Sequence, residues 1–484
     1  MTGFAATHRL FDTVAAERPS AVAVEAPDGE LTFAELDARS RALAADLRGR
    51  GIGAEDVVAV KCARSTWLIV AMLGVWRAGA AFLLLDPTEP EARIAEKLAL
   101  AGAKAVIGDD WPSGQARSAP EETRPGVPEE VHPRLLAYVV FTSGSTGSPK
   151  GVLIEHLGLA EHVLTQLAPA YRKVAADGTL RVGGGAPVTF DSFIDQVLPT
   201  IALGHRLVLF DEMERRDPGS FLTGNLDVVD CSPSQLALLV EFGLLDEPLD
   251  LLVFGGEKPG AELWKALRAS GTTAISIYGA TECSIGSVEA EVHETERVCL
   301  GFPAGSATAY VLGPDLLPVR PGEPGEIYLG GPGVGRGYLG DARQTARSFL
   351  PDPFAGEPGV RMYRTGDLGR VGEDGRLEFL GRADDQLKIS GYRIEPGEVE
   401  SVLDGLAGVR RSAVVPAGTG GRMSHLVAYV EAAEGFDADE VRARLAERLP
   451  GYLVPRRIVP VEAIPLTHNG KTDRKRLAAM NGER

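Results

Sequence analysis

The stretch YVVFTSGSTGSPKG, from Tyr138 to Gly151, joins an apolar segment to a loop of glycines, hydroxyl side chains and one lysine. Residues 135–140 have the length and composition of a buried strand. A loop of this kind offers backbone N–H groups, hydroxyls and the Lys150 ammonium to a polyphosphate. The stretch therefore predicts a phosphate-binding loop at the end of a strand.

Three alternatives compete for this loop. A P-loop requires GxxxxGK[ST], but Pro149 precedes the lysine and Gly151 follows it, so the required hydroxyl is missing. A hydrolase nucleophile turn requires GxSxG, and the run from Ser143 to Gly147 lacks the first glycine. A plain exposed loop is the third alternative, which the buried-looking strand before it disfavours.

On both sides of this loop, the first two-thirds of the chain alternates runs of β-branched residues with helical patterns. This alternation predicts parallel sheets covered by helices, an α/β fold. The expected strands are 57–60, 80–85 and 105–107, and the expected helices are 67–77 and 91–101.

From Gly325 onward the pattern changes to antiparallel, β-barrel-like strands at 325–330 and 377–380. Turn residues at 381–385 precede a small α+β unit with strands at 413–415 and 426–430 and a helix at 438–449. With 484 residues the chain is too long for one core. We expect a large domain, 1–383, joined by a hinge to a small domain, 384–484.

The net charge differs between the two expected domains. Residues 385–484 carry 15 Lys and Arg against 14 Asp and Glu, whereas the whole chain has a net charge of −17. A cationic small domain and an anionic large one suit an anionic ligand between them, although a chance imbalance explains the numbers equally well. The acidic total argues against nucleic acid or an anionic membrane as partner.

The cysteines lack the spacing of a zinc site or disulfide framework, and the N-terminus has no signal-peptide core. We therefore expect a soluble, cytoplasmic protein with reduced thiols.

The sequence resembles the adenylate-forming superfamily, and specifically the adenylation domains of nonribosomal peptide synthetases. The likeness rests on an ordered set of motifs along nearly the whole chain. They are LTFAEL (31–36), RAGAAFLLLDP (77–87), the phosphate loop, IYGATE (277–282), YRTGDL (363–368), GRADDQLKISGYRIEPGEVE (381–400), LPGYLVP (449–455) and NGKTDR (469–474).

The resemblance implies a two-step ligase that uses ATP and Mg²⁺. A carboxylate attacks the α-phosphate of ATP to give an acyl-adenylate and pyrophosphate, and the acyl group then passes to a phosphopantetheine thiol. Such chemistry needs positioning and charge neutralisation. The implied phosphate ligands are Thr142, Ser143, Gly144, Ser145, Thr146, Gly147 and Lys150.

The resemblance also implies the nucleotide and catalytic residues. Glu282 would hold Mg²⁺, Thr281 would touch the α-phosphate, and Lys471 would bridge the carboxylate and α-phosphate. Asp384 is the implied hinge. The implied adenine and ribose contacts are Gly256, Glu257, Ser276, Ile277, Tyr278, Gly279, Asp367, Phe379 and Arg382. The chain departs from the family at Ala280, where proline is usual, at Ser276 for asparagine and at Phe379 for tyrosine.

The implied acyl pocket contains three carboxylates and no cation besides Lys471, which disfavours an acidic substrate. Its residues are Asp191, Ser192, Asp195, Asp230, Val253, Gly255, Ile277, Ile285 and Gly286. Asp191 is the family position that pairs with an α-ammonium. Asp195 and Asp230 predict either an apolar β-amino acid, with its ammonium displaced by one carbon, or a basic α-amino acid such as ornithine or lysine. A third alternative places Asp195 in solvent or in a buried polar network without a role in selectivity.

Carrier-type and condensation-type motifs are absent from the sequence, so we expect a free-standing enzyme with a separate carrier protein and room for an MbtH-like activator. Two competing classes are an acyl- or aryl-CoA ligase of the same fold and a degenerate nucleotide-binding protein. Asp191 and the NGKTDR motif argue against the first, and the intact Lys150, Glu282, Asp367 and Lys471 argue against the second.

Overall fold

The computed structural model describes residues 6–111, 131–144, 148–175, 178–246, 249–389, 391–418, 424–467 and 471–480. Their backbone contacts divide the chain into two compact units. One contains Met1–Pro87, Leu100–Val140 and Gly151–Ala383, and the other contains Thr88–Ala99, Phe141–Lys150 and Asp384–Arg484. Two segments from the first third of the chain therefore cluster with the C-terminal hundred residues.

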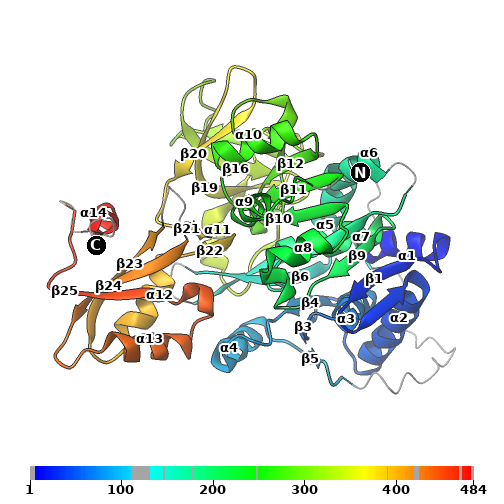
Figure 1. The fold of residues 1–484 in the computed structure, drawn as a ribbon, viewed down its shortest axis with the longest axis horizontal. Coiled ribbons are helices and arrows are strands. Elements are labelled where there is room, and N and C mark those ends of the chain that lie inside the picture. The colour runs from blue at the N-terminus through cyan, green and yellow to red at the C-terminus, as the bar shows by residue number, and fades with distance from the viewer. Residues whose placement is uncertain are drawn as a thin grey trace. The chain divides into compact units, whose positions relative to one another are not determined.

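A nine-stranded sheet organises the first unit (Figure 1). Its central strands are parallel, because helices connect them, whereas β2, β13 and β14 pair antiparallel at the two edges. In spatial order the strands are β14 (Phe302–Pro303), β13 (Val288–Glu291), β12 (Thr273–Tyr278), β11 (Leu251–Gly255), β10 (Val228–Cys231), β8 (Arg181–Gly184), β9 (Arg206–Leu209), β1 (Val22–Ala26) and β2 (Gly29–Thr32).

A six-stranded sheet accounts for the βαβ rhythm of the first 150 residues. Its order is β17 (Gly337–Tyr338), β7 (Lys150–Glu155), β6 (Leu136–Thr142), β4 (Ala81–Leu84), β3 (Val57–Lys61) and β5 (Ala105–Gly108). A five-stranded antiparallel sheet follows, with β15 (Thr308–Leu312), β16 (Gly325–Gly330), β19 (Arg361–Val371), β18 (Phe349–Pro351) and β20 (Leu377–Arg382).

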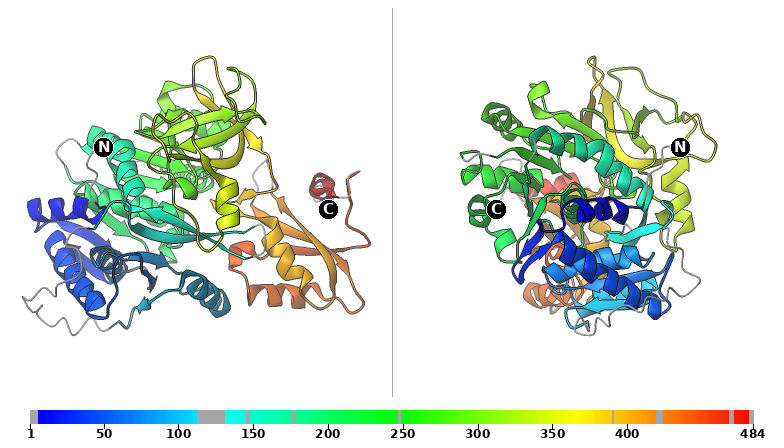
Figure 2. Two further views of the ribbon diagram at one scale, coloured as in Figure 1. Left: turned by 180° about the vertical axis from the view of Figure 1, so that it is seen from behind. Right: turned by 90° about the vertical axis from the view of Figure 1, so that its right-hand side faces the viewer.

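Helices cover these sheets with their apolar faces. Thr32 and Glu35 form a reciprocal capping box at the start of α2, and α2 packs along α3 and beside α1 (blue in Figure 2). The helices are α1 (His8–Glu17), α2 (Phe33–Gly49), α3 (Thr66–Arg77), α5 (His156–Glu161), α6 (Ala168–Ala175), α7 (Asp191–Ala202), α8 (Pro218–Thr223), α9 (Pro233–Glu241), α10 (Ala261–Ser270) and α11 (Ala342–Ser348). No helix among the described residues is long and apolar enough to cross a membrane.

Arg64 connects the two large sheets of the first unit. It follows β3 of the six-stranded sheet, is buried, and donates to the carbonyls of Gly184, Ala186 and Phe210 at the ends of β8 and β9. The Nη1–O distance to Ala186 is 2.7 Å. Burial lowers the pKa of Arg64 to about 10, which still leaves the guanidinium charged.

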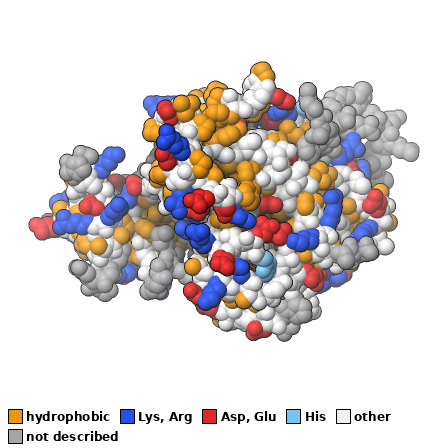
Figure 3. Space-filling model, turned by 90° about the horizontal axis from the view of Figure 1, so that it is seen from above, with side chains coloured by type: hydrophobic (Ala, Val, Ile, Leu, Met, Phe, Trp, Pro, Cys, Tyr) orange, Lys and Arg blue, Asp and Glu red, His pale blue; other side chains and the backbone are white. Residues whose placement is uncertain are grey.

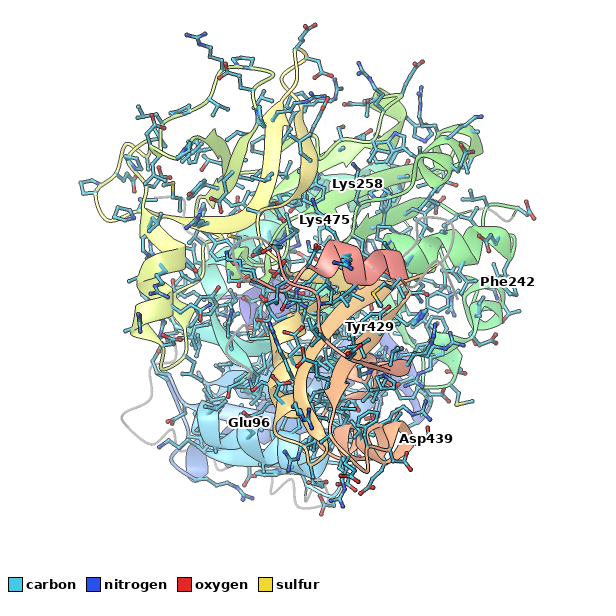
Figure 4. The ribbon with its side chains drawn as sticks, turned by 90° about the vertical axis from the view of Figure 1, so that its left-hand side faces the viewer. Glu96, Phe242, Lys258, Tyr429, Asp439 and Lys475 are labelled. Carbon is cyan, nitrogen blue, oxygen red and sulfur yellow. The ribbon has the colours of Figure 1, made fainter. Side chains whose placement is uncertain are left out.

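The second unit contains a three-stranded sheet with a core on each face. The sheet consists of β23 (Val409–Ala417), β24 (His425–Ala432) and β25 (Arg457–Val461), beside the hairpin β21 (Leu387–Ile389) and β22 (Tyr392–Ile394). The helices are α4 (Glu91–Ala101), α12 (Pro396–Asp404), α13 (Ala438–Ala446) and α14 (Arg474–Met480). Figure 4 labels Glu96 on α4, Tyr429 on β24, Asp439 on α13 and Lys475 on α14.

These sheets confirm the expected α/β class with a small α+β unit at the C-terminus. Acidic and basic side chains are interspersed on the face drawn in Figure 3.

Candidate active site

The predicted nucleotide and acyl residues of the first unit gather at the carboxyl ends of β10, β11 and β12. Asp230 lies opposite Val253, and Gly255 opposite Ile277, in the register of these parallel strands. Tyr278 ends β12 one residue further on. Open parallel sheets bind ligands at this edge. The fold thus brings together side chains that lie far apart in the sequence.

One sheet face carries the acyl-side residues. Asp230 shares a face with Val228, and Val253 shares one with Leu251, because side chains alternate along a strand. Val228, Leu251, Val253 and Ile277 pack in one core cluster with Leu167 and Tyr171, which lie on the segment after α5. The side chain of Asp230 therefore faces the segment 162–175.

Asp367, Tyr278 and Arg382 form one hydrogen-bonded group. The Tyr278 hydroxyl donates to Asp367 Oδ2 at 2.7 Å, and Arg382 Nη1 donates to Asp367 Oδ1 at 2.7 Å. Residues 367 and 382 are direct partners in the pairing of β19 with β20. Burial and the Asp367 charge raise the pKa of Tyr278 well above its ordinary value, so its hydroxyl is a permanent donor at neutral pH. Both oxygens of this buried carboxylate are compensated.

The remaining predicted adenine-side residues flank this group. Ser276 is buried on β12, and Gly256 has a φ of +84°, which a side chain would strain. Glu257 accepts hydrogen bonds from the Ser234 backbone and hydroxyl. Phe379, on β20, offers its carbonyl to Lys258 Nζ at 3.5 Å.

Glu282 lies fully buried in a short 3₁₀ turn, Thr281–Cys283, directly after the Tyr278–Ala280 loop. Tyr338 donates its hydroxyl to Glu282 Oε1 at 2.7 Å. Thr281 hydrogen-bonds the Asp191 side chain, and the Glu282 charge acts on the same carboxyl group. Among the described residues no cluster of three His, Cys, Asp or Glu could hold a metal alone. One carboxylate supplemented by phosphate oxygens fits Mg²⁺, which keeps few protein ligands.

The phosphate loop belongs to the second unit, and Ser145, Thr146 and Gly147 lie outside the described residues. The Ser143 hydroxyl donates to the Arg393 carbonyl at 2.8 Å, and the Gly144 N–H donates to Glu398 at 3.3 Å. A Cβ on Gly144 would lie 1.8 Å from the Ser148 carbonyl, so the turn requires glycine. The Thr142 hydroxyl is buried and has no hydrogen-bond partner among the described residues, as suits a group that binds a ligand. Lys150 begins β7.

Lys471 and Asp384 also belong to the second unit. The Lys471 side chain is exposed, and its backbone exchanges hydrogen bonds with Thr467. Asp384 is exposed and accepts a hydrogen bond from the Gln386 N–H at 3.2 Å.

Helix α7 supplies Asp191, Ser192 and Asp195. Asp191 Oδ1 accepts from the Ser192 N–H at 2.9 Å, and burial raises the pKa of Asp191. Asp230 is buried on β10, and burial and then the Asp195 charge raise its pKa well above the ordinary value. Asp191 and Asp230 form no ion pair within the part of the chain that the structure describes.

Asp195 differs, because its Oδ1 lies 2.7 Å from His162 Nε2. His162 begins a π-helical turn, His162–Leu167, between α5 and α6. The predicted acyl set contained no cation besides Lys471, and the structure adds His162, which lies beside Asp195. Sequence reasoning missed His162 because its only signal is an ordinary i, i+4 spacing to Gln166 on a helical pattern.

A tight turn carries Ile285 and Gly286. Ser284 and Ile285 both have positive φ, +57° and +79°, which is unusual for a β-branched residue. A Cβ on Gly286 would lie 2.5 Å from Gln166 Oε1, 2.8 Å from Ile277 Cγ2 and 2.9 Å from His162 Cε1. Gly286 thus lies against His162 and Gln166, and His162 in turn contacts Asp195.

Comparisons with known proteins agree with this geometry. The profile of the AMP-binding enzyme family matches residues 11–339, and that of the AMP-binding enzyme C-terminal domain matches residues 398–471. The chain belongs to the AMP-binding enzyme family. Its members are adenylate-forming ligases, as the ordered motifs imply.

Among relatives of this AMP-binding enzyme are large peptide synthetases. It is 38% identical over 492 residues to one of the proteins that make up the linear gramicidin synthase of Brevibacillus parabrevis, covering 98% of this chain and 6% of that protein. It is 38% identical over 506 residues to phosphinothricin tripeptide synthetase PhsB of Streptomyces viridochromogenes, covering 97% of this chain and 41% of that protein. The chain thus spans less than half the length of these relatives.

Solved structures show the same fold. NpsA-ThdA, an artificially fused adenylation–PCP di-domain from Klebsiella oxytoca, aligns with a TM-score of 0.82 and 25% identity. The alignment covers 95% of this chain and 94% of that one.

Proposed function

We propose that the enzyme activates an amino acid with ATP and transfers it to a carrier protein. A substrate carboxylate oxygen bonds to the α-phosphorus, and the bond to the β-phosphate bridging oxygen breaks, which releases pyrophosphate. A phosphopantetheine sulfur then bonds to the acyl carbon as AMP leaves. The Tyr278–Asp367–Arg382 group supports binding of the ribose, and Glu282 supports binding of Mg²⁺ beside the phosphates. Lys471 would neutralise the charge that develops on the α-phosphate.

One observation carries the choice of an amino acid, namely two carboxyl groups, the buried Asp230 and the part-buried Asp191, that have no cationic partner among the described residues. Asp191 and Asp230 form no ion pair among the described residues, and burial disfavours their charged forms. A substrate ammonium supplies the missing charge. A fatty or aryl acid would instead leave both carboxyl groups uncompensated.

Asp230 lies on the strand side of the acyl residues and Asp191 on α7. An ammonium bound by Asp230 therefore suits an amine displaced from the α-position, and Val253, Ile277 and Ile285 add an apolar end. These features support an apolar β-amino acid. A basic α-amino acid is the second candidate, with its distal ammonium on Asp230 rather than on Asp195, which His162 already occupies.

Substrate-dependent ATP–pyrophosphate exchange tests the proposal. The panel contains apolar β-amino acids, their α-isomers, ornithine, lysine, 2,4-diaminobutyrate, and fatty and aryl acids. We expect exchange with apolar β-amino acids and a loss of about 10- to 100-fold in kcat/KM for Asp230→Asn, because a charged hydrogen bond contributes roughly 1.5–3 kcal/mol. Asp250→Asn, at an exposed site before β11, is the matched control. Exchange only with acids that lack an amine would overturn the proposal.

The second step is tested separately with a phosphopantetheinylated carrier protein, coenzyme A and an MbtH-like protein as additions. We expect a thioester on the carrier, consistent with a place in nonribosomal peptide or polyketide antibiotic biosynthesis. A product on coenzyme A instead would assign the enzyme to the acyl-CoA ligases.

A further inference from the structure

His162 is a buried titratable side chain beside the acyl residues, and the sequence motifs do not mark it. It begins the π-helical turn His162–Leu167 and is 2% exposed. Single π-turns within α-helices are frequent at functional sites. The turn packs on the same sheet face as Asp230 and contacts α7, which carries Asp195.

Both ring nitrogens of His162 meet acceptors. Nε2 lies 2.7 Å from Asp195 Oδ1, and Nδ1 lies 2.7 Å from Gln166 Oε1. The Gln166 side chain also acts on the Glu289 carboxylate, while its buried amide nitrogen has no hydrogen-bond partner among the described residues. A neutral imidazole can donate from one nitrogen only, so acceptor oxygens at both ring nitrogens favour the imidazolium form.

The surrounding charges agree with that form. Burial lowers the pKa of His162, but the charge and hydrogen bond of Asp195, the bond to Gln166 and the charge of Glu161 outweigh it and raise the pKa above its ordinary value. Glu289, from β13, adds a further negative charge near the ring. The acidic groups that face His162 thus come from its own helix, from α7 and from β13.

Two of the three acyl-side carboxyl groups, Asp195 and Asp230, consequently differ in their charge partners. Asp195 has a fixed protein cation, whereas Asp230 has none among the described residues, and the Asp195 charge acts on Asp230. His162 and Gln166 also contact the position where Gly286 lacks a side chain. His162 and Gln166 therefore limit the volume beside Gly286 that a substrate could occupy, and His162 also limits which charges can bind there.

We propose that His162 is a positioning residue that determines specificity. Because His162 pairs with Asp195, the substrate can place only one ammonium group in the site, and Asp191 and Asp230 bind it. This inference rests on the proposed amino acid activation. It adds that His162 prevents diamino acids from being accepted as substrates. Without the imidazolium, Asp195 becomes a second ammonium site.

The test compares His162→Gln, Asp195→Asn and the double variant in pyrophosphate exchange. We expect His162→Gln to raise kcat/KM for 2,4-diaminobutyrate or ornithine, relative to an apolar monoamino acid, by about 10-fold or more, because one unpaired buried charge is worth at least a pKa unit. We expect no such rise in Asp195→Asn, and loss of the rise in the double variant. An unchanged ratio in folded His162→Gln, or a wild-type preference for diamino acids, would overturn the inference while leaving adenylation intact.

A second measurement does not depend on activity. NMR of the ¹⁵N-labelled histidine ring in the full chain should show His162 protonated above pH 6.5 and titrating at lower pH in Asp195→Asn. A wild-type ring that is neutral at pH 6.5 would overturn the inference. Absence of exchange with every amino acid would instead contradict the proposed function, and the NMR result would still decide the state of His162.

Discussion

Asp367 and Asp230 are both buried carboxyl groups of the candidate site, the first on β19 and the second on β10, yet only Asp367 has its charge balanced by the protein. Asp367 accepts from Tyr278 and Arg382, so its charge is balanced before any ligand binds. Asp230 has no ion pair among the described residues, and burial raises its pKa. A site for an invariant nucleotide can be completed by the protein itself. A site that selects its ligand by charge must leave one charge for the ligand to balance.

We expect the largest effect on stability when the hydrogen-bonded group of Tyr278, Asp367 and Arg382 is disrupted. Asp367→Ala removes the buried carboxylate that Tyr278 and Arg382 both contact, which should cost about 3–5 kcal/mol in the free energy of unfolding. Urea denaturation measures it, with Asp374→Ala, at an exposed turn, as the control. A loss no larger than the control's would mean that the nucleotide-side group does not contribute to stability.

The second prediction uses histidines that are buried without charge. Burial lowers the pKa of His8 and His156 to about 3, below the 6.5 of an unfolded chain. The unfolded state therefore takes up protons first, and stability is lost as pH falls from about 6.5 toward 3, by up to about 1.4 kcal/mol per pH unit for each ring. Thermal unfolding between pH 7 and pH 4 measures this. His156→Gln should reduce the slope, and an unaltered slope would assign the acid sensitivity to other groups.

Gly286→Ala is expected to have an intermediate effect confined to the acyl side. A Cβ there meets three atoms closer than 3.0 Å, so His162, Gln166 or the backbone must shift at a cost of about 1–3 kcal/mol. KM for the amino acid should rise while KM for ATP stays the same in exchange assays. Equal changes in both constants would indicate a general disruption of the fold. Gly260→Ala, where a Cβ has open space, is the matched control.

The smallest expected effect is an increase in the stability of the ligand-free enzyme on substitution of Asp230. Asp230 has a pKa raised above its unfolded value, so its contribution to stability is complete below about pH 4 and declines as pH rises. Asp230→Asn removes this titration and should stabilise the ligand-free enzyme at pH 8 by about 1 kcal/mol while it impairs amino acid activation. Differential scanning fluorimetry at pH 5 and pH 8 measures the difference. A stabilisation that shrinks as pH rises would contradict the uncompensated carboxyl group.

Local sequence explains much of this fold. The apolar run before Asp86 became β4, and the amphipathic run after Pro90 became α4 with the expected ends. Glycine and hydroxyl density located the loop after β6. These elements are predictable because their periodicity and turn residues act within a few positions.

The candidate site was predictable only where motifs carried it. Tyr278 and Asp367 are 89 positions apart, and no local pattern connects them. His162 lies 33 positions from Asp195 on a turn whose π-geometry departs from helical spacing, so neither periodicity nor motif order marks the pair. Long-range charge pairing is a property of tertiary structure, and the sequence offers no rule for it.

We expect Arg64 to couple the unfolding of the two large sheets of the first unit. Its guanidinium spans from the strand end of one sheet to three carbonyls of the other, so an intermediate with only one sheet formed would expose this cation to water or bury it without acceptors. Lysine cannot replace it, since one ammonium does not have the width to reach carbonyls in different strands. We therefore expect the six-stranded and nine-stranded sheets to unfold together, because one buried side chain hydrogen-bonds across them.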